Sequence, residues 1–203
     1  MRLAPFSAVL TILLASTAAA ESVTPDRPLT VVLDFRGVYS APTVTAMERE
    51  TERILGSAGI HLEWRTKGAS PIETSGALVL VRFNGRCRLE PVGYLFDERG
   101  PLAFTYATDG QVQPFSEVAC DQVVSSVRLG MLPGDYSHAD QFFGRALGRV
   151  VAHELVHILT GESTHAKEGV TRRGLSPDRL VAPTLNLQPE DIQRIRSSLQ
   201  SAR

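Results

Sequence analysis

The stretch DQFFGRALGRVVAHELVHILTG, residues 140–161, decides how this chain folds. It is apolar on nearly every helical face around residues 150–159, which is typical of a helix buried in a protein core. Ser137 and Asp140 have the spacing of a capping box at its start, with Asp in place of the usual Glu. Gly161 stands where a left-handed residue commonly ends a helix. We therefore predict one long buried helix over residues 140–160.

Three polar residues interrupt this apolar helix. His153 and His157 are four residues apart, so both imidazoles lie on one helical face, where they can bind a single zinc ion. Buried polar groups need a partner, and a metal ion would provide one. Glu154 stands between them, where a carboxylate can take a proton from water activated by the metal. The HExxH order predicts a hydrolytic Zn²⁺ site with His153 and His157 as ligands and Glu154 as general base.

A third protein ligand is expected, because catalytic zinc sites combine three protein ligands with one open position. His165 follows the glycine turn at Gly161, which can return the chain to the same ion. A carboxylate is the alternative, and the candidates are Glu162, Glu168 and the more distant Glu190. In the remaining alternative, no third side chain binds the ion, and water takes that position.

The segment HELVHILTGESTH, residues 153–165, resembles the extended motif HExxHxxGxxH of the metzincin metallopeptidases. This resemblance implies His153, His157 and His165 as zinc ligands, Glu154 as base and Gly161 as the turn. The spacing is one residue longer on each side of the glycine, giving HExxHxxxGxxxH. The family also has a methionine in a turn beneath the metal, whereas residues 169–171 stand about there with no methionine.

The resemblance implies a zincin fold and the zinc-dependent hydrolysis of peptide bonds in a peptide or protein substrate. Two other functions stay open. One is a non-catalytic zinc-binding module or degenerate peptidase that binds partners, although a structural site has no need of Glu154. The other is amidase action on cell-wall or small substrates.

The remaining sequence predicts an α/β domain, and the resemblance to zincins implies the α+β arrangement of that fold. A twisted mixed sheet packs on a backing helix at residues 42–58 and on the long helix, and the irregular C-terminal part ends in a short helix from Pro189. An edge strand at 103–108 or 116–120 could bind peptide by strand addition. The predicted strands are residues 29–35, 60–65 and 77–83, with shorter candidates at 93–96, 103–108 and 123–127. The residues Thr108-Asp109-Gly110 predict a turn.

Residues 1–20 follow the pattern of a signal peptide cleaved near Ala20, with an uncleaved membrane anchor as the alternative. We therefore expect a single mature domain, residues 21–203, that is secreted or periplasmic and not inserted in a membrane. In such a compartment Cys87 and Cys120 favour a disulfide over two buried thiols. The net charge of −1 without a basic stripe argues against a nucleic-acid partner.

Overall fold

The computed structural model describes residues 28–68, 76–90, 100–132 and 134–201. The predicted signal peptide, residues 1–20, and the predicted strand at residues 93–96 lie outside the described residues. Within the described part of the chain, no helix combines the length and apolarity that crossing a bilayer requires.

The described strands form one five-stranded mixed sheet in the order β2-β1-β3-β5-β4. All neighbouring strands pair in parallel except β4, which runs antiparallel to β5 and forms one edge of the sheet. The buried apolar residues of β1 and β3 are typical of central strands in a parallel arrangement. The strands are β1 (Leu29–Phe35), β2 (Leu62–Thr66), β3 (Leu78–Asn84), β4 (Ala103–Thr108) and β5 (Gln111–Ala119).

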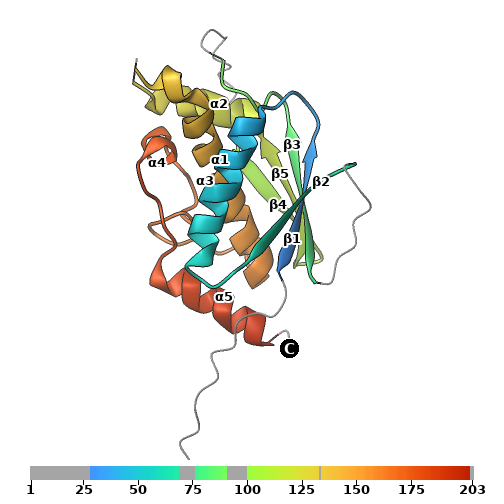
Figure 1. Ribbon diagram of the computed structural model, residues 1–203. Helices are drawn as coiled ribbons and strands as arrows, with labels where there is room; N and C mark the ends of the chain where they lie inside the picture. The colour runs from blue at the N-terminus through green and yellow to red at the C-terminus, as the bar shows by residue number, and fades with distance from the viewer. Residues whose placement is uncertain (1–27, 69–75, 91–99, 133, 202–203) are drawn as a thin grey trace, which may run out of the picture.

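The long helices α1 and α3 pack together against one face of this sheet, and α5 crosses beneath them (Figure 1). The predicted α/β class, the two packed helices and the C-terminal helix are therefore confirmed. The helices are α1 (Ala41–Gly56), α2 (Cys120–Gly130), the 3₁₀ turn η1 (Asp135–His138), α3 (Ala139–Thr160), α4 (Pro177–Val181) and α5 (Pro189–Ser201).

Two glycines set the distance between α1 and α3. A Cβ atom at Gly144 would lie 2.5 Å from the Cβ atom of Ala46, and one at Gly148 would lie 2.7 Å from the carbonyl oxygen of Met47. Neither position has room for a side chain, so the two helix backbones are in close contact there. This contact fixes the position of α3, which carries His153 and His157.

Arg149 connects these helices to the irregular C-terminal part. Its side chain is fully buried, and its Nε atom donates to Glu50 Oε1 on α1 at 2.9 Å. Its terminal nitrogens donate to the carbonyls of Arg179, Leu180 and Ala182, at 2.6, 3.1 and 2.7 Å. A buried charge needs partners of this kind, so the end of α4 is held against α3.

Three local predictions were wrong. Residues 123–127 belong to α2, because Val123, Val124 and Val127 are buried at helical spacing. Residues 116–119 lie in β5, between β3 and β4, so they form no sheet edge. The capping box is absent, since Ser137 donates to the Gly134 carbonyl and Asp140 accepts from Thr43 on α1.

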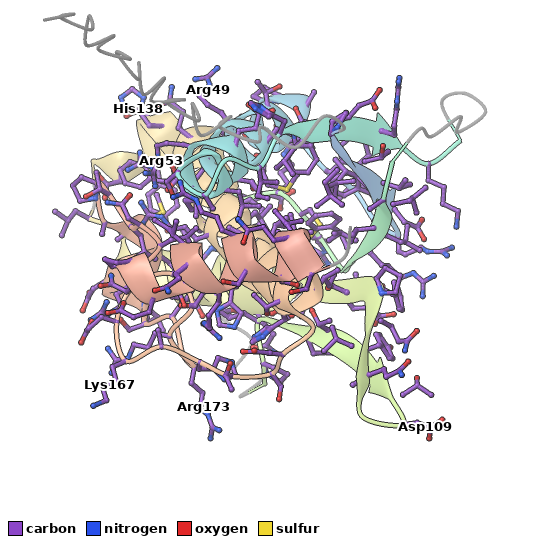
Figure 2. All side chains as sticks on the ribbon, turned by 90° about the horizontal axis from the view of Figure 1, so that it is seen from below. Arg49, Arg53, Asp109, His138, Lys167 and Arg173 are labelled. Carbon is purple, nitrogen blue, oxygen red and sulfur yellow. A yellow bond between two sulfur atoms is a disulfide. The ribbon has the colours of Figure 1, made fainter. Side chains whose placement is uncertain are left out.

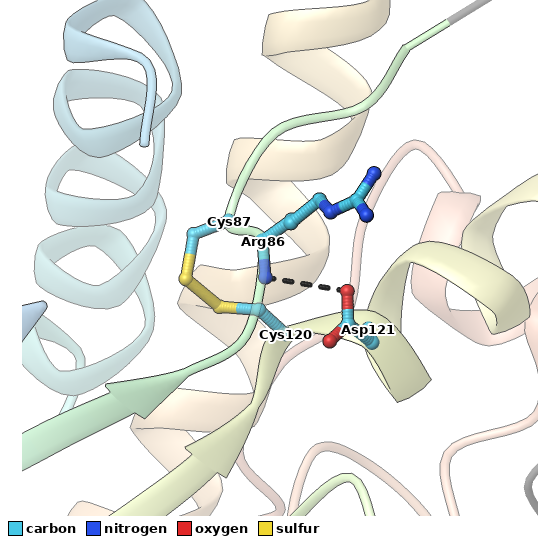
Figure 3. Close-up of a disulfide and its surroundings, with 4 residues drawn as sticks. All are labelled: Arg86, Cys87, Cys120 and Asp121. Carbon is cyan, nitrogen blue, oxygen red and sulfur yellow. Dashed lines mark hydrogen bonds between the residues drawn. A yellow bond between two sulfur atoms is a disulfide. The ribbon is translucent and has the colours of Figure 1, made fainter. Parts of the chain in front are cut away.

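The hairpin turn and the disulfide, in contrast, are confirmed. Asp109 and Gly110 both have positive φ, 51° and 77°, as a two-residue turn between β4 and β5 requires. Cys87 and Cys120 form a disulfide with Cα atoms 4.9 Å apart, which joins the segment after β3 to the start of α2 (Figure 3). Beside it, the Arg86 backbone N–H donates to Asp121 Oδ1 at 3.2 Å.

Candidate metal centre

His153 and His157 lie one turn apart on α3, and each ring is held by a backbone carbonyl. The His153 Nδ1 atom is 2.8 Å from the Val170 carbonyl oxygen, and the His157 Nδ1 atom is 2.7 Å from that of Glu162. Because a carbonyl oxygen only accepts, both Nδ1 atoms carry a proton. In neutral rings the Nε2 atoms are then left with free lone pairs, which is the state that binds a metal.

These two Nε2 atoms face each other at 3.1 Å, and both rings are only 9 % exposed. Burial, together with the nearby His157 and His165, lowers the pKa of His153 to about 4, so its ring is neutral at physiological pH. Two lone pairs at this distance repel unless a cation lies against both. Nitrogens bound to tetrahedral zinc at about 2.0–2.1 Å lie about 3.3–3.4 Å apart, so the observed spacing suits such an ion.

His165 brings a third imidazole to the same place. Gly161 ends α3 in the left-handed conformation, with φ 67°, and the chain turns back as the glycine predicted. One ligand nitrogen from each of the three histidines lies within 4.8 Å of the other two, so together they could hold a metal ion. Among the described residues, this is the one group of three or more His, Cys, Asp or Glu side chains arranged in this way.

The rival carboxylates are not grouped with the three histidines. Glu162 Oε2 accepts from Arg194 at 3.0 Å and from Thr164 at 2.8 Å. Glu168 Oε2 accepts from Arg179 at 2.6 Å. Glu190 is exposed in the first turn of α5. The group that could hold a metal ion therefore includes His165 and none of these three glutamates.

Glu154 is 5 % exposed, and its carboxylate is held from the edge strand β4. Thr105 Oγ1 donates to Glu154 Oε2 at 2.7 Å, and the buried Ser116 hydroxyl on β5 lies 2.7 Å from Thr105 Oγ1. Burial raises the pKa of Glu154 to about 7, although the hydrogen bond from Thr105 lowers it in part. A carboxyl group with this pKa can both take and give a proton near neutral pH.

Sequence reasoning did not identify Thr105 as part of the site. The alternation of side chains along β4 indicates which of them face inward: Phe104 and Tyr106 are exposed on one face of the strand, and Thr105 points to the other. Which helix lies on that inner face depends on tertiary packing, and a single strand does not encode it.

Residues 169–171 lie beside His153, since the Val170 carbonyl oxygen contacts its Nδ1 atom. The Val170 side chain is fully buried, and its backbone N–H donates to the Asn186 carbonyl at 3.0 Å. Gly169 has a φ of 80°, and a Cβ atom there would lie 2.7 Å from the Asn186 carbonyl oxygen. Only glycine fits this tight approach, which presents the Val170 carbonyl to His153.

A cavity of about 580 Å³ opens in front of these groups. Its walls come from β4, from α3 and from the chain on either side of the turn, and they include Thr105, Glu154, the three histidines and Leu175. Lys167 and Arg173 project from the nearby chain into solvent (Figure 2). His138 lies apart from the site, at the start of α3 (Figure 2).

No known protein family and no curated protein matches this sequence. The fold resembles that of archaemetzincin. The crystal structure of archaemetzincin from Methanopyrus kandleri matches with a TM-score of 0.54, covering 88 % of this chain and 99 % of that chain. The sequence identity is 11 %, so the likeness to archaemetzincin is one of fold.

Proposed function

We propose that this protein is a zinc-dependent metallopeptidase that hydrolyses peptide bonds. The observation that carries the proposal is the meeting of His153, His157 and His165 with Glu154 in one cavity. The archaemetzincin-like fold and the motif HExxHxxxGxxxH both support it.

The residues present suit zinc. The Nε2 atoms of His153 and His157 and one ring nitrogen of His165 would hold the ion, since neutral imidazoles are preferred zinc ligands. When bound, zinc acidifies water and polarises a carbonyl group as a Lewis acid. Each buried ring keeps its Nδ1 proton on a backbone carbonyl, which fixes both its tautomer and its orientation.

Glu154 would act as the general base. Thr105 fixes Oε2, which leaves Oε1 to accept a proton from the attacking water. Its raised pKa lets the same carboxyl group return that proton to the leaving amine nitrogen. Among the described strands, β4 (residues 103–108) lies at an edge of the sheet and beside the cavity, where it would pair with an extended peptide.

We also propose that the protein acts outside the cytoplasm, with residues 1–20 as a cleaved signal peptide. The Cys87–Cys120 disulfide supports this location, because such bonds persist in oxidising compartments.

The test uses residues 21–203, purified as wild type and as Glu154→Gln. We expect about one zinc ion per chain in both proteins, and cleavage of a mixed peptide library by the wild type. Loss of the base should lower kcat/KM by a factor of roughly 10²–10⁴. Glu168→Gln is the matched control, because this exposed glutamate pairs with Arg179, and we expect wild-type activity.

The alternatives predict different results. Zinc binding without cleavage of any peptide by the wild type would indicate a non-catalytic zinc-binding module. Cleavage of cell-wall or small amides, but not of peptides, would indicate an amidase. Full activity of Glu154→Gln, on peptides or on other amides, would contradict the role of Glu154 as general base.

A further inference from the structure

The carbonyls that hold His153 and His157 belong to two separate loop segments. The Val170 carbonyl is in the turn near Gly169, and the Glu162 carbonyl directly follows the end of α3. Neither lies in a helix or strand that would fix it by regular hydrogen bonds. Contacts with other parts of the chain therefore hold these segments in place, and the hydrogen bond from Val170 to Asn186 is one of them.

Asp191 on α5 holds the first segment. Its side chain is fully buried, and Oδ2 accepts from the hydroxyl of Thr171, the residue next to Val170. The Gln188 backbone N–H donates to the same oxygen at 3.3 Å. A buried carboxylate also needs a cation, and Arg194 supplies it, with Nη2 at 2.5 Å from Oδ1.

Arg194 holds the second segment with the other arm of its guanidinium group. Nη1 donates to Glu162 Oε2 at 3.0 Å and to Thr164 Oγ1 at 2.6 Å. One planar side chain therefore reaches the turn, through Asp191, and the segment that follows α3. Arginine suits this role because its donors form a rigid fork.

We propose that Arg194 and Asp191 are positioning residues that hold the two carbonyl acceptors, and through them the imidazoles of His153 and His157, in the geometry that binds zinc. The proposal rests on the proposed function for the identity of the metal. Outer partners of ligands typically change metal affinity by about 10–100-fold, so the C-terminal helix would set zinc affinity without touching the ion.

The first measurement is the zinc dissociation constant, by competition with a chelator. Arg194→Gln and Thr171→Val should each weaken zinc binding by about 10–100-fold. Thr171→Ser keeps the hydroxyl group and should keep the wild-type affinity. Arg196→Gln is the matched control, since Arg196 is on the same helix but donates to the carbonyls of Ser57 and Ala58.

The second measurement is made without metal. In the wild type, the ¹⁵N shifts of the His153 and His157 rings should report the Nδ1–H tautomer, and in Arg194→Gln and Thr171→Val they should report a mixture of tautomers. This readout tests the positioning role even if wild-type zinc binding, and with it the proposed function, fails.

Wild-type zinc affinity and tautomers in both Arg194→Gln and Thr171→Val would overturn the proposal. An equal loss in Arg196→Gln would also overturn it, because the effect would then belong to α5 as a whole. If circular dichroism shows that Arg194→Gln does not fold, Thr171→Val decides, since it keeps both charges of the ion pair.

Discussion

Thr105 and Glu154 are joined by a 2.7 Å hydrogen bond that links the edge strand β4 to helix α3. They are 49 residues apart in sequence, yet the hydroxyl fixes one oxygen of the carboxylate that we propose as the base. The Ser116 hydroxyl, buried on β5, is hydrogen-bonded to Thr105 in turn. The orientation of Glu154 thus depends on the position of β4.

Thr105→Val should therefore lower kcat without removing the metal. Valine has a similar shape but no hydroxyl, so Glu154 loses its fixed orientation and kcat should fall by about tenfold to a hundredfold. Thr105→Ser keeps the donor and should retain most of the activity. Steady-state kinetics and zinc content are the measurements, and an unchanged kcat in Thr105→Val would contradict the positioning role.

His165→Ala tests the third ligand. We expect it to weaken zinc binding by more than the roughly hundredfold loss that changing an outer partner causes, because the proposed ligand set loses a direct ligand. Chelator competition measures the effect. His138→Ala is the matched control, since His138 is exposed at the start of α3 and lies away from the site. Unchanged affinity in His165→Ala would favour a carboxylate or water as third ligand.

Gly148→Ala tests the contact between α1 and α3. The new Cβ atom would lie 2.7 Å from the Met47 carbonyl oxygen and 2.8 Å from the Glu50 Cβ atom. Overpacking of this kind lowers the free energy of unfolding by about 1–3 kcal/mol. The roughly 1 kcal/mol that alanine adds as a better helix former offsets part of this loss, so we expect a net loss of up to about 2 kcal/mol.

Urea unfolding measures this difference, with Gly56→Ala as the control. Gly56 is also helical, but a Cβ atom there meets nothing within 4 Å, so alanine should leave stability unchanged or raise it by up to about 1 kcal/mol. Equal effects of the two substitutions would argue against close packing at Gly148.

Asp34→Asn tests a cluster of charges on the sheet. Asp34 is 5 % exposed, and its Oδ2 atom lies 3.0 Å from Arg36, 3.2 Å from Lys67 and 3.2 Å from Arg82. Burial raises the pKa of Asp34, but the hydrogen bonds from Lys67 and Arg82 and the charge of Arg36 outweigh it, so the pKa lies below its ordinary value of 3.8.

The sign of the pH dependence follows from this lowered pKa. The ionised carboxylate stabilises the fold above the unfolded-state value of 3.8, and this contribution is lost as the pH falls through the lower folded-state pKa. Asp34→Asn should thus be less stable than the wild type at pH 7, and the gap should narrow below about pH 4. Urea unfolding across this range measures it. The partly exposed Glu63, paired with Arg65, offers the control Glu63→Gln, with little change expected.

The sequence predicted the features that depend on local pattern. The apolar run of residues 140–160 predicted a buried helix, and the four-residue spacing of His153 and His157 predicted that both rings lie on one face of it. The helix end at Gly161 and the turn at Asp109-Gly110 were also predicted from local sequence, because glycine readily adopts the positive φ angles that both features require.

Other features depend on contacts between distant residues. The run at 123–127 is too short for its pattern to separate strand from helix, and only its packing makes it helical. Arg194 reaches Glu162 across 32 residues, and Thr171 reaches Asp191 across 20. A lone Arg or Asp on an amphipathic helix looks like ordinary surface charge, so no single-sequence pattern singles out these partners.

The glycine contact between α1 and α3 makes the wall of the cavity that α3 forms rigid. Since Gly144 and Gly148 bring the helix backbones together without intervening side chains, α1 and α3 cannot slide past each other without a steric clash. The histidine-bearing wall therefore belongs to a rigid body. Under the proposed function, adaptation to substrates of different width would then come from residues 172–175, which line the cavity and lie in no helix or strand. The strand β4, in contrast, is held to α3 by the hydrogen bond between Thr105 and Glu154.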